Sequence, residues 1–181
     1  MNITILRIGH RQERDARVTT HIGLTARALG ADSMHLAGSD KQVKESIEKV
    51  TKCWGGNFAV HNNIDWKKAI IQWKKHGGKI IHLTMYGISI QEALSQIHTD
   101  DKLMIVVGAE KVPSELYQIA DLNVAVGNQP HSEIAALAIF LDRLNIKQGI
   151  DSFTHEYPGG KRKIIPQAHG KKVIKDEIAQ D

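Results

Sequence analysis

Six apolar, β-branched runs recur along this chain, and a helical pattern separates each run from the next. The runs cover residues 3–8, 33–37, 57–61, 79–85, 103–109 and 122–127. The intervening patterns predict helices over residues 18–29, 40–53, 64–76, 89–98, 113–120 and 131–145. Several runs, such as "LMIVVGA", are continuously apolar, as in parallel strands that are buried on both faces. The sequence therefore predicts an α/β fold with a mainly parallel sheet and helices on both faces.

The length of 181 residues is typical of one domain with its own core, so we expect residues 1–181 to form a single domain. From about residue 150 the pattern weakens into a basic C-terminal segment. This segment contains the basic turn "YPGGKRK" (157–163) and "IIPQ", which suggests a short strand, before a polar end.

The last predicted helix begins at Pro130, His131 and Ser132, where proline suits the first turn. Its run "IAALAIFL" (134–141) has no polar side, and such a helix must be covered all round. The sheet can cover one face only. We therefore expect a homodimer in which Phe140 and Leu141 contact the second copy.

Net charge and cysteine content set the broad class. The formal net charge is +4 with ten histidines, which suits a nucleic-acid partner and equally an ordinary basic surface. The single cysteine, Cys53, allows no internal disulfide and suits a reducing compartment. The N-terminal apolar run is too short for a signal peptide, and no apolar stretch is long enough to span a membrane. We expect a soluble, cytoplasmic protein.

Arginines gather just after the first predicted strand, in and around "GHRQERDARVTTHIGLTARALGAD" (9–32). They are Arg7, Arg11, Arg14, Arg17 and Arg27. One interpretation is a solvated face with salt bridges to Glu13 and Asp15, the usual fate of a charge run. The other is a phosphate-rich partner, because the segment follows the carboxyl end of a strand, where ligands of parallel sheets bind, and guanidinium groups match phosphate geometry.

Three glycine-containing turns follow strands that we expect to be neighbours: "HLTMYG" (82–87), "VGAEKVP" (107–113) and "VGNQPHSE" (126–133). Glycine permits close approach of the backbone to a ligand. Free backbone groups in these turns could bind the edge of an adenine while Leu83 and Val112 pack on its faces. Each turn alone is typical of an ordinary strand end, and only the three together predict a pocket.

Other chemistries have little support in the sequence. A glycine fingerprint for dinucleotides after the first strand, a P-loop, C-x-x-C, H-E-x-x-H and G-x-S-x-G are all missing. His131 beside Ser132 is better explained as a helix start than as a nucleophile with its base. These absences argue against a metal centre and against a hydrolase.

The segments "LRIGHRQERDARVTTHIGLTARALGAD", "HLTMYG", "VGAEKVP" and "NVAVGNQPHSEIAALA" closely resemble the archaeal tRNA (cytidine(56)-2′-O)-methyltransferase family, of the SPOUT class. The resemblance runs from residue 3 to about 145 and through 163–173, and it is loose over 38–78 and 145–162. It implies S-adenosylmethionine as methyl donor, without a metal, and the 2′-hydroxyl of cytidine 56 in the T-loop of tRNA as acceptor. It also implies a C-terminal trefoil knot and a homodimer.

The resemblance implies particular site residues as well. The donor-binding positions are Leu83, Gly108, Ala109, Glu110, Lys111, Val112, Val126, Gly127, Asn128, Gln129, Pro130, His131, Ser132 and Glu133. The candidates for assisting the acceptor hydroxyl are Arg14 and Arg17, followed by His21, and the motif does not decide between the two arginines. Because the arginine pKa lies above about 12, we expect an electrostatic role rather than proton abstraction.

Two alternatives come from other classes. A non-catalytic RNA-binding protein of the same fold would suit the charge but has no need of an adenine pocket. A nucleotide-dependent hydrolase would need the phosphate loop and metal ligands that are missing here.

Overall fold

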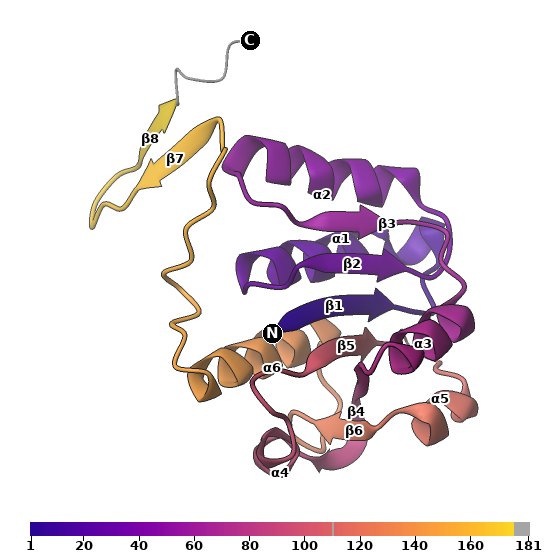
Figure 1. Ribbon diagram of the computed structural model, residues 1–181. Coiled ribbons are helices and arrows are strands. Elements are labelled where there is room, and N and C mark those ends of the chain that lie inside the picture. The colour runs from indigo at the N-terminus through magenta and orange to yellow at the C-terminus, as the bar shows by residue number, and fades with distance from the viewer. Residues whose placement is uncertain (110, 176–181) are drawn as a thin grey trace.

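The structure is a computed structural model that describes residues 1–109 and 111–175. Its centre is one six-stranded sheet in the order β3-β2-β1-β5-β4-β6, and all neighbouring strands are parallel (Figure 1). The strands are β1 (Asn2–Arg7), β2 (Ser33–Leu36), β3 (Ala59–His61), β4 (Lys79–Ser89), β5 (Lys102–Val107) and β6 (Leu122–Ala125). The predicted parallel α/β sheet is confirmed.

Helices cover both faces of the sheet, as predicted. They are α1 (Gln12–Ala28), α2 (Lys41–Trp54), α3 (Trp66–Lys75), α4 (Ile90–Ser95), α5 (Ser114–Ile119) and α6 (Glu133–Lys147). Side chains alternate along β1 between two cores. Ile3 and Ile5 join the core under α1, α2, α4 and α6, whereas Leu6 joins the core under α3 and α5.

The first helix begins at Gln12, six residues before the predicted start at residue 18. Its first turn is almost wholly charged, so apolar periodicity cannot reveal it. Arg11 stands at the N-cap without a capping side-chain bond, and the carboxylate of Asp15 instead accepts a hydrogen bond from the Arg11 backbone N–H at 3.0 Å. The arginine segment therefore lies mainly on a helix.

Strand β4 is four residues longer than predicted because it contains an irregularity. Leu83 and Ile88 both pair with Val124 of β6, and the intervening residues loop out. A Cβ atom on Gly87 would overlap the backbone of Asn123 and Val124, so only glycine allows the two strands this approach. The loop carries Thr84, Met85 and Tyr86 to the carboxyl edge of the sheet.

The expectation for Phe140 and Leu141 on α6 was wrong. Both side chains are fully buried in the chain's own core, on a stripe with Leu137 and Leu144 that faces the sheet and α1. The exposed face of α6 instead carries Ile139 (43% exposed) and Ile146 (56%). The all-apolar run hid this division, since residues only one apart along a helix point about 100° apart.

After α6, the chain crosses the ends of α1 and α2 and forms an antiparallel hairpin of β7 (Arg162–Ile165) and β8 (Lys172–Lys175). The hairpin projects from the body of the molecule (Figure 1). The predicted short strand at "IIPQ" overlaps β7 at Ile164 and Ile165 only. The trefoil knot stays a prediction. No helix in the described ranges is long and apolar enough to cross a membrane.

Candidate active site

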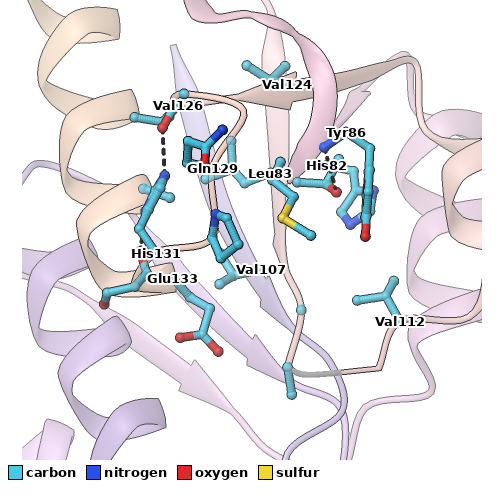
Figure 2. A pocket seen from close by; sticks show the side chains of 18 of the residues that line it. His82, Leu83, Tyr86, Val107, Val112, Val124, Val126, Gln129, His131 and Glu133 are labelled. Carbon is cyan, nitrogen blue, oxygen red and sulfur yellow. Dashed lines mark hydrogen bonds between the residues drawn. The ribbon is translucent and has the colours of Figure 1, made fainter.

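A cavity of about 280 Å³ opens where β4, β5 and β6 end, between the three loops that follow these strands (Figure 2). Its apolar wall comes from Leu83, Val107, Val124, Val126 and Ala136. Polar side chains of the loop before α6 and of its first turn line the cavity as well. They are the side chains of Gln129, His131, Ser132 and Glu133. The cavity thus pairs an apolar slot with a polar edge, the usual build of a small-molecule site.

The loop before α6 is held in shape by its own hydrogen bonds. Gly127 has a φ of 79°, a left-handed conformation that favours glycine. The Nε2 atom of His131 lies 2.6 Å from the Val126 carbonyl oxygen, the contact drawn in Figure 2. The hydroxyl of Ser132 accepts from the Ile134 N–H and caps α6. The amide of Asn128 donates to the Met85 carbonyl at 2.7 Å, which ties this loop to the loop of β4.

The loop after β5 rests on a buried arginine. Arg7 at the end of β1 is 1% exposed, and its guanidinium donates to the Gly108 carbonyl and, through Nε, to Thr19 Oγ1 at 3.3 Å. Its Nη1 atom lies 3.9 Å from a carboxylate oxygen of Glu133 at the cavity rim. Burial lowers the pKa of Arg7 and the nearby Glu133 opposes this, so the group stays cationic. Arg7 therefore links the Gly108 loop to the start of α6.

A second buried hydrogen-bond network is joined to Arg7 through Thr19. His10 lies between Thr19 and Asp40, with ring nitrogens 2.9 Å from Thr19 Oγ1 and 3.0 Å from Asp40 Oδ2. The side chains of His10 and Asp40 are at most 2% exposed. Asp40 also caps α2 by accepting from the Val43 N–H. The carboxyl end of β1 is thus fixed to α1 and α2 as well as to the cavity.

His82 forms part of the cavity wall and is fully buried. Its Nδ1 atom lies 2.8 Å from Asn123 Oδ1, and the amide of Asn123 donates to the Tyr117 carbonyl at 2.8 Å. The Tyr117 ring meets the imidazole edge-on at 4.8 Å. Burial lowers the pKa of His82, so the neutral imidazole is favoured.

Most of the predicted donor-binding residues line this one cavity. They are Leu83, Gly108, Ala109, Val112, Val126, Gly127, Gln129, Pro130, His131, Ser132 and Glu133. Lys111 and Asn128 do not line it, although Asn128 joins two of its loops. Glu110 lies outside the described residues.

Eight lining residues were not among the predicted donor-binding positions. His82, Thr84, Met85, Tyr86 and Val107 belong to the predicted turns without having been given a role, and Tyr117, Val124 and Ala136 lie outside those turns. Met85 and Tyr86 reach the cavity because β4 loops out, which the predicted strand end at residue 85 concealed. The sequence held no local signal for Tyr117, because the ring that it meets at 6.3 Å, that of Tyr86, belongs to a distant segment of the chain.

The arginine-rich segment divides into three groups. Arg7 and Arg27 are buried inside the chain, so they belong neither to a solvated face nor to a phosphate-facing one. Arg11 is exposed and pairs with Asp15 at 3.0 Å, as the salt-bridge interpretation expected. The catalytic candidates Arg14, Arg17 and His21 are exposed residues spaced by three and four along α1, so they share one helix face. None of these three lines the cavity of its own chain.

Several solved structures with this fold are described as RNA methyltransferases. A crystal structure of an RNA 2′-O ribose methyltransferase matches 82% of the chain with a TM-score of 0.60 at 14% identity, and the chain spans 57% of that protein's length. The methyltransferase AviRb of Streptomyces viridochromogenes, solved with S-adenosylmethionine, matches 82% with a TM-score of 0.55 at 15% identity, and the chain spans 58% of it. The fold is therefore that of the SpoU and TrmH methyltransferases, the SPOUT class.

The family within this class follows from closer relatives. The model of the family described as tRNA ribose 2′-O-methyltransferase, aTrm56, matches residues 54–174. The tRNA (cytidine(56)-2′-O)-methyltransferase of Methanocella arvoryzae is 57% identical over 97% of this chain and 98% of its own. That of Methanococcoides burtonii is 54% identical over 95% of both chains. The chain belongs to the aTrm56 family of tRNA ribose 2′-O-methyltransferases, which confirms the resemblance found in the sequence.

Proposed function

We propose that this chain transfers a methyl group from S-adenosylmethionine to the ribose 2′-hydroxyl of cytidine 56 of tRNA, and that the cavity beyond β4, β5 and β6 holds the donor. Relatives at 54–57% identity over nearly the whole chain carry the names of this reaction. A tRNA substrate and the single unpaired cysteine, Cys53, both suit the cytoplasm.

The cavity suits the donor in size and in chemistry. Its volume of about 280 Å³ lies just below the range of roughly 300–1,000 Å³ that is typical of small-molecule sites. A flat adenine suits the apolar slot between Leu83 and Val112, with backbone groups of the Gly108 and Gly127 loops at its edge. A Cβ atom on Gly108 would overlap the Val112 side chain and narrow this slot. Gly108→Val should therefore lose donor affinity in calorimetry, and unchanged affinity would move the donor site elsewhere.

The donor supplies an electrophilic methyl group, and the chain needs no nucleophile of its own. The loops hold the donor in line with the acceptor and exclude water. Glu133 at the rim, close to the cationic Arg7, sets the local charge beside the slot. This division requires no metal, so activity should survive a chelator.

We assign Arg14 and Arg17 to the acceptor rather than to the donor. Both are exposed on α1, which starts at the same sheet edge as the cavity. Gly9, just before α1, lies close to Ala109 of the cavity loop: a Cβ atom added to Gly9 would lie 3.1 Å from the Cβ atom of Ala109. A cation beside the ribose stabilises the oxyanion that forms when the hydroxyl loses its proton. His21 lies one turn further on the same face and is the next candidate.

The observation that carries the proposal is the meeting of the three predicted loops around one cavity. The direct test is incubation with labelled S-adenosylmethionine and unmodified tRNA, followed by mapping of the methylated nucleotide. We expect label at the ribose of cytidine 56, and none on a tRNA with a single 2′-deoxycytidine there. Label on that deoxy substrate would indicate base methylation, and tRNA binding without any transfer would indicate a non-catalytic RNA-binding protein.

We further propose a homodimer whose contact includes the exposed face of α6. Ile139 and Ile146 are large apolar side chains at 43% and 56% exposure on this face. A second copy packed on this face would bury both side chains, as expected for a helix whose run 134–141 has no polar side.

A further inference from the structure

The charge of this chain is concentrated in one place. Residues 161–175, here called the basic hairpin, contain six Lys and Arg residues and no Asp or Glu. Residues 1–160 contain 18 Lys and Arg against 17 Asp and Glu, so the body of the molecule is nearly neutral, and the sequence after the hairpin contains Asp176, Glu177 and Asp181. The cations of the hairpin are Lys161, Arg162, Lys163, Lys171, Lys172 and Lys175.

The hairpin presents these cations to solvent on both of its faces. Arg162 pairs with Lys175 across the ladder, so both side chains point to one face, whereas Lys163 and Lys172 point to the other. All six are exposed. Among residues 1–109 and 111–175, no carboxylate forms an ion pair with any of them. A solvated face of a folded domain usually mixes both signs of charge, and this one does not.

The base of the hairpin is clamped to the body by backbone contacts that need glycine. The Gly56 N–H donates to the Pro158 carbonyl at 2.9 Å, and a Cβ atom on Gly55 would overlap the carbonyl of Tyr157. A Cβ atom on Gly160 would lie 2.7 Å from the carbonyl carbon of Trp54 at the end of α2. The chain just before the hairpin is therefore fixed in direction rather than loosely attached.

Buried Arg27 completes this clamp. Its Nη2 atom donates to the Gly55 carbonyl at 2.6 Å, and its guanidinium lies 4.7 Å from the centre of the Tyr157 ring. The Tyr157 hydroxyl donates back to the Arg27 carbonyl at 2.8 Å. An isolated two-stranded hairpin is only marginally stable in water. Its ladder mixes the cations with exposed Ile164, Val173 and Ile174, and it contains no carboxylate, so a rigid mount under it calls for a partner.

We propose that the basic hairpin binds the phosphate backbone of the tRNA substrate. Closely spaced cations without carboxylates among them match a polyanion such as a nucleic-acid backbone. The hairpin lies at the β3 and α2 side of the molecule, across the sheet from the cavity beside β6 (Figure 1). It therefore acts on tRNA affinity and not on donor binding in its own chain. The inference rests on the proposed function only in taking tRNA as the ligand.

The test compares two triple variants of the full chain. The hairpin variant replaces Lys163, Lys171 and Lys172 by Gln. The matched control replaces three exposed lysines of α2 and α3 by Gln: Lys49, Lys68 and Lys75. The Kd for unmodified tRNA is measured between about 50 and 300 mM KCl. The hairpin variant should bind at least about tenfold more weakly at low salt, and its log Kd should depend on log salt with a slope smaller by about 2–3. The control should keep the wild-type slope, and all three proteins should bind S-adenosylmethionine equally.

A hairpin variant with the wild-type slope, or a control that loses as much, would overturn the inference. So would a change in sedimentation with tRNA binding intact, because the hairpin would then serve contact between copies. The proposed reaction fails separately. If tRNA binding depends on the hairpin but the wild-type chain transfers no methyl group, the proposed reaction is wrong and the inference stands. If the chain transfers the methyl group and the hairpin variant binds tRNA as wild type does, the inference is wrong and the proposed reaction stands.

Discussion

Arg7 shows how one buried side chain organises the site. The sequence placed it in an arginine-rich segment that faces ligand or solvent, but it is 1% exposed and hydrogen-bonds the Gly108 carbonyl and Thr19. Residue spacing could not reveal this, because β1 is buried on both faces and no alternation of buried and exposed residues marks Arg7 as buried. Arg11, four residues later, forms the ordinary surface pair that a charge run predicts.

Arg7→Met should destabilise the protein and weaken the donor site. Hydrogen bonds to charged groups contribute about 1.5–3 kcal/mol, so we expect the free energy of unfolding in urea to fall by about 2–3 kcal/mol. Calorimetry should show weaker S-adenosylmethionine binding, because the Gly108 carbonyl loses the hydrogen bond from Arg7 that holds its loop. The exposed Arg17→Met should change stability by no more than about 0.5 kcal/mol. Equal stability of the two variants would show that the buried contacts of Arg7 contribute nothing.

His82 should make stability depend on pH. Burial lowers its folded-state pKa, so the unfolded chain binds more protons as the pH falls below about 6.5. Stability is then full above that pH and decreases as the pH falls toward the folded-state pKa, since protonation would leave Nε2 buried without an acceptor among the described residues. His82→Gln should lose less unfolding free energy between pH 7.5 and 5.5 than wild type, with His35 supplying part of the remainder.

If His82→Gln retains the wild-type pH dependence of the urea midpoint, the titrating group lies elsewhere in the chain.

At the scale of elements, sequence patterns found the six strands and six helices but misplaced features that depend on tertiary contact. The start of α1 was missed because its first turn is charged and is held by Asp15. The loop in β4 was missed because its cause is the close approach of β6 at Gly87, a residue about 35 positions earlier in the chain. The three donor loops were found because glycines at strand ends are local signals. His82 and Tyr117 were missed because their pairing is not local.

Gly87→Ala should disturb the cavity through the backbone of β6. Rigid backbone cannot yield to the added methyl group, so we expect a loss of about 1–3 kcal/mol in unfolding free energy and weaker donor binding. Gly149→Ala is a matched control, since Gly149 has a φ of 72° and open space around it away from the cavity. It should cost stability by backbone strain alone. Unchanged donor affinity in Gly87→Ala would separate the β4 loop from the site.

At the scale of the whole molecule, we expect the chain to form a homodimer through the exposed face of α6. Ile139→Arg places a charge on the exposed face of α6 without touching the core stripe of Leu137, Phe140 and Leu141. We expect folded monomers by sedimentation at micromolar concentration, where wild type sediments as a dimer. Phe140→Arg should instead give unfolded protein, because that position is fully buried. A wild-type monomer, or a dimer that tolerates Ile139→Arg, would place the contact on another face.

The basic hairpin, set against a nearly neutral body, makes the distribution of charge over the described residues asymmetric. A polyanion that diffuses toward it is drawn to one end, so most first collisions are already oriented. Speed of encounter and duration of the complex are then set by different parts of the chain. Added salt should slow association much more than it hastens release, and stopped-flow mixing would resolve the two.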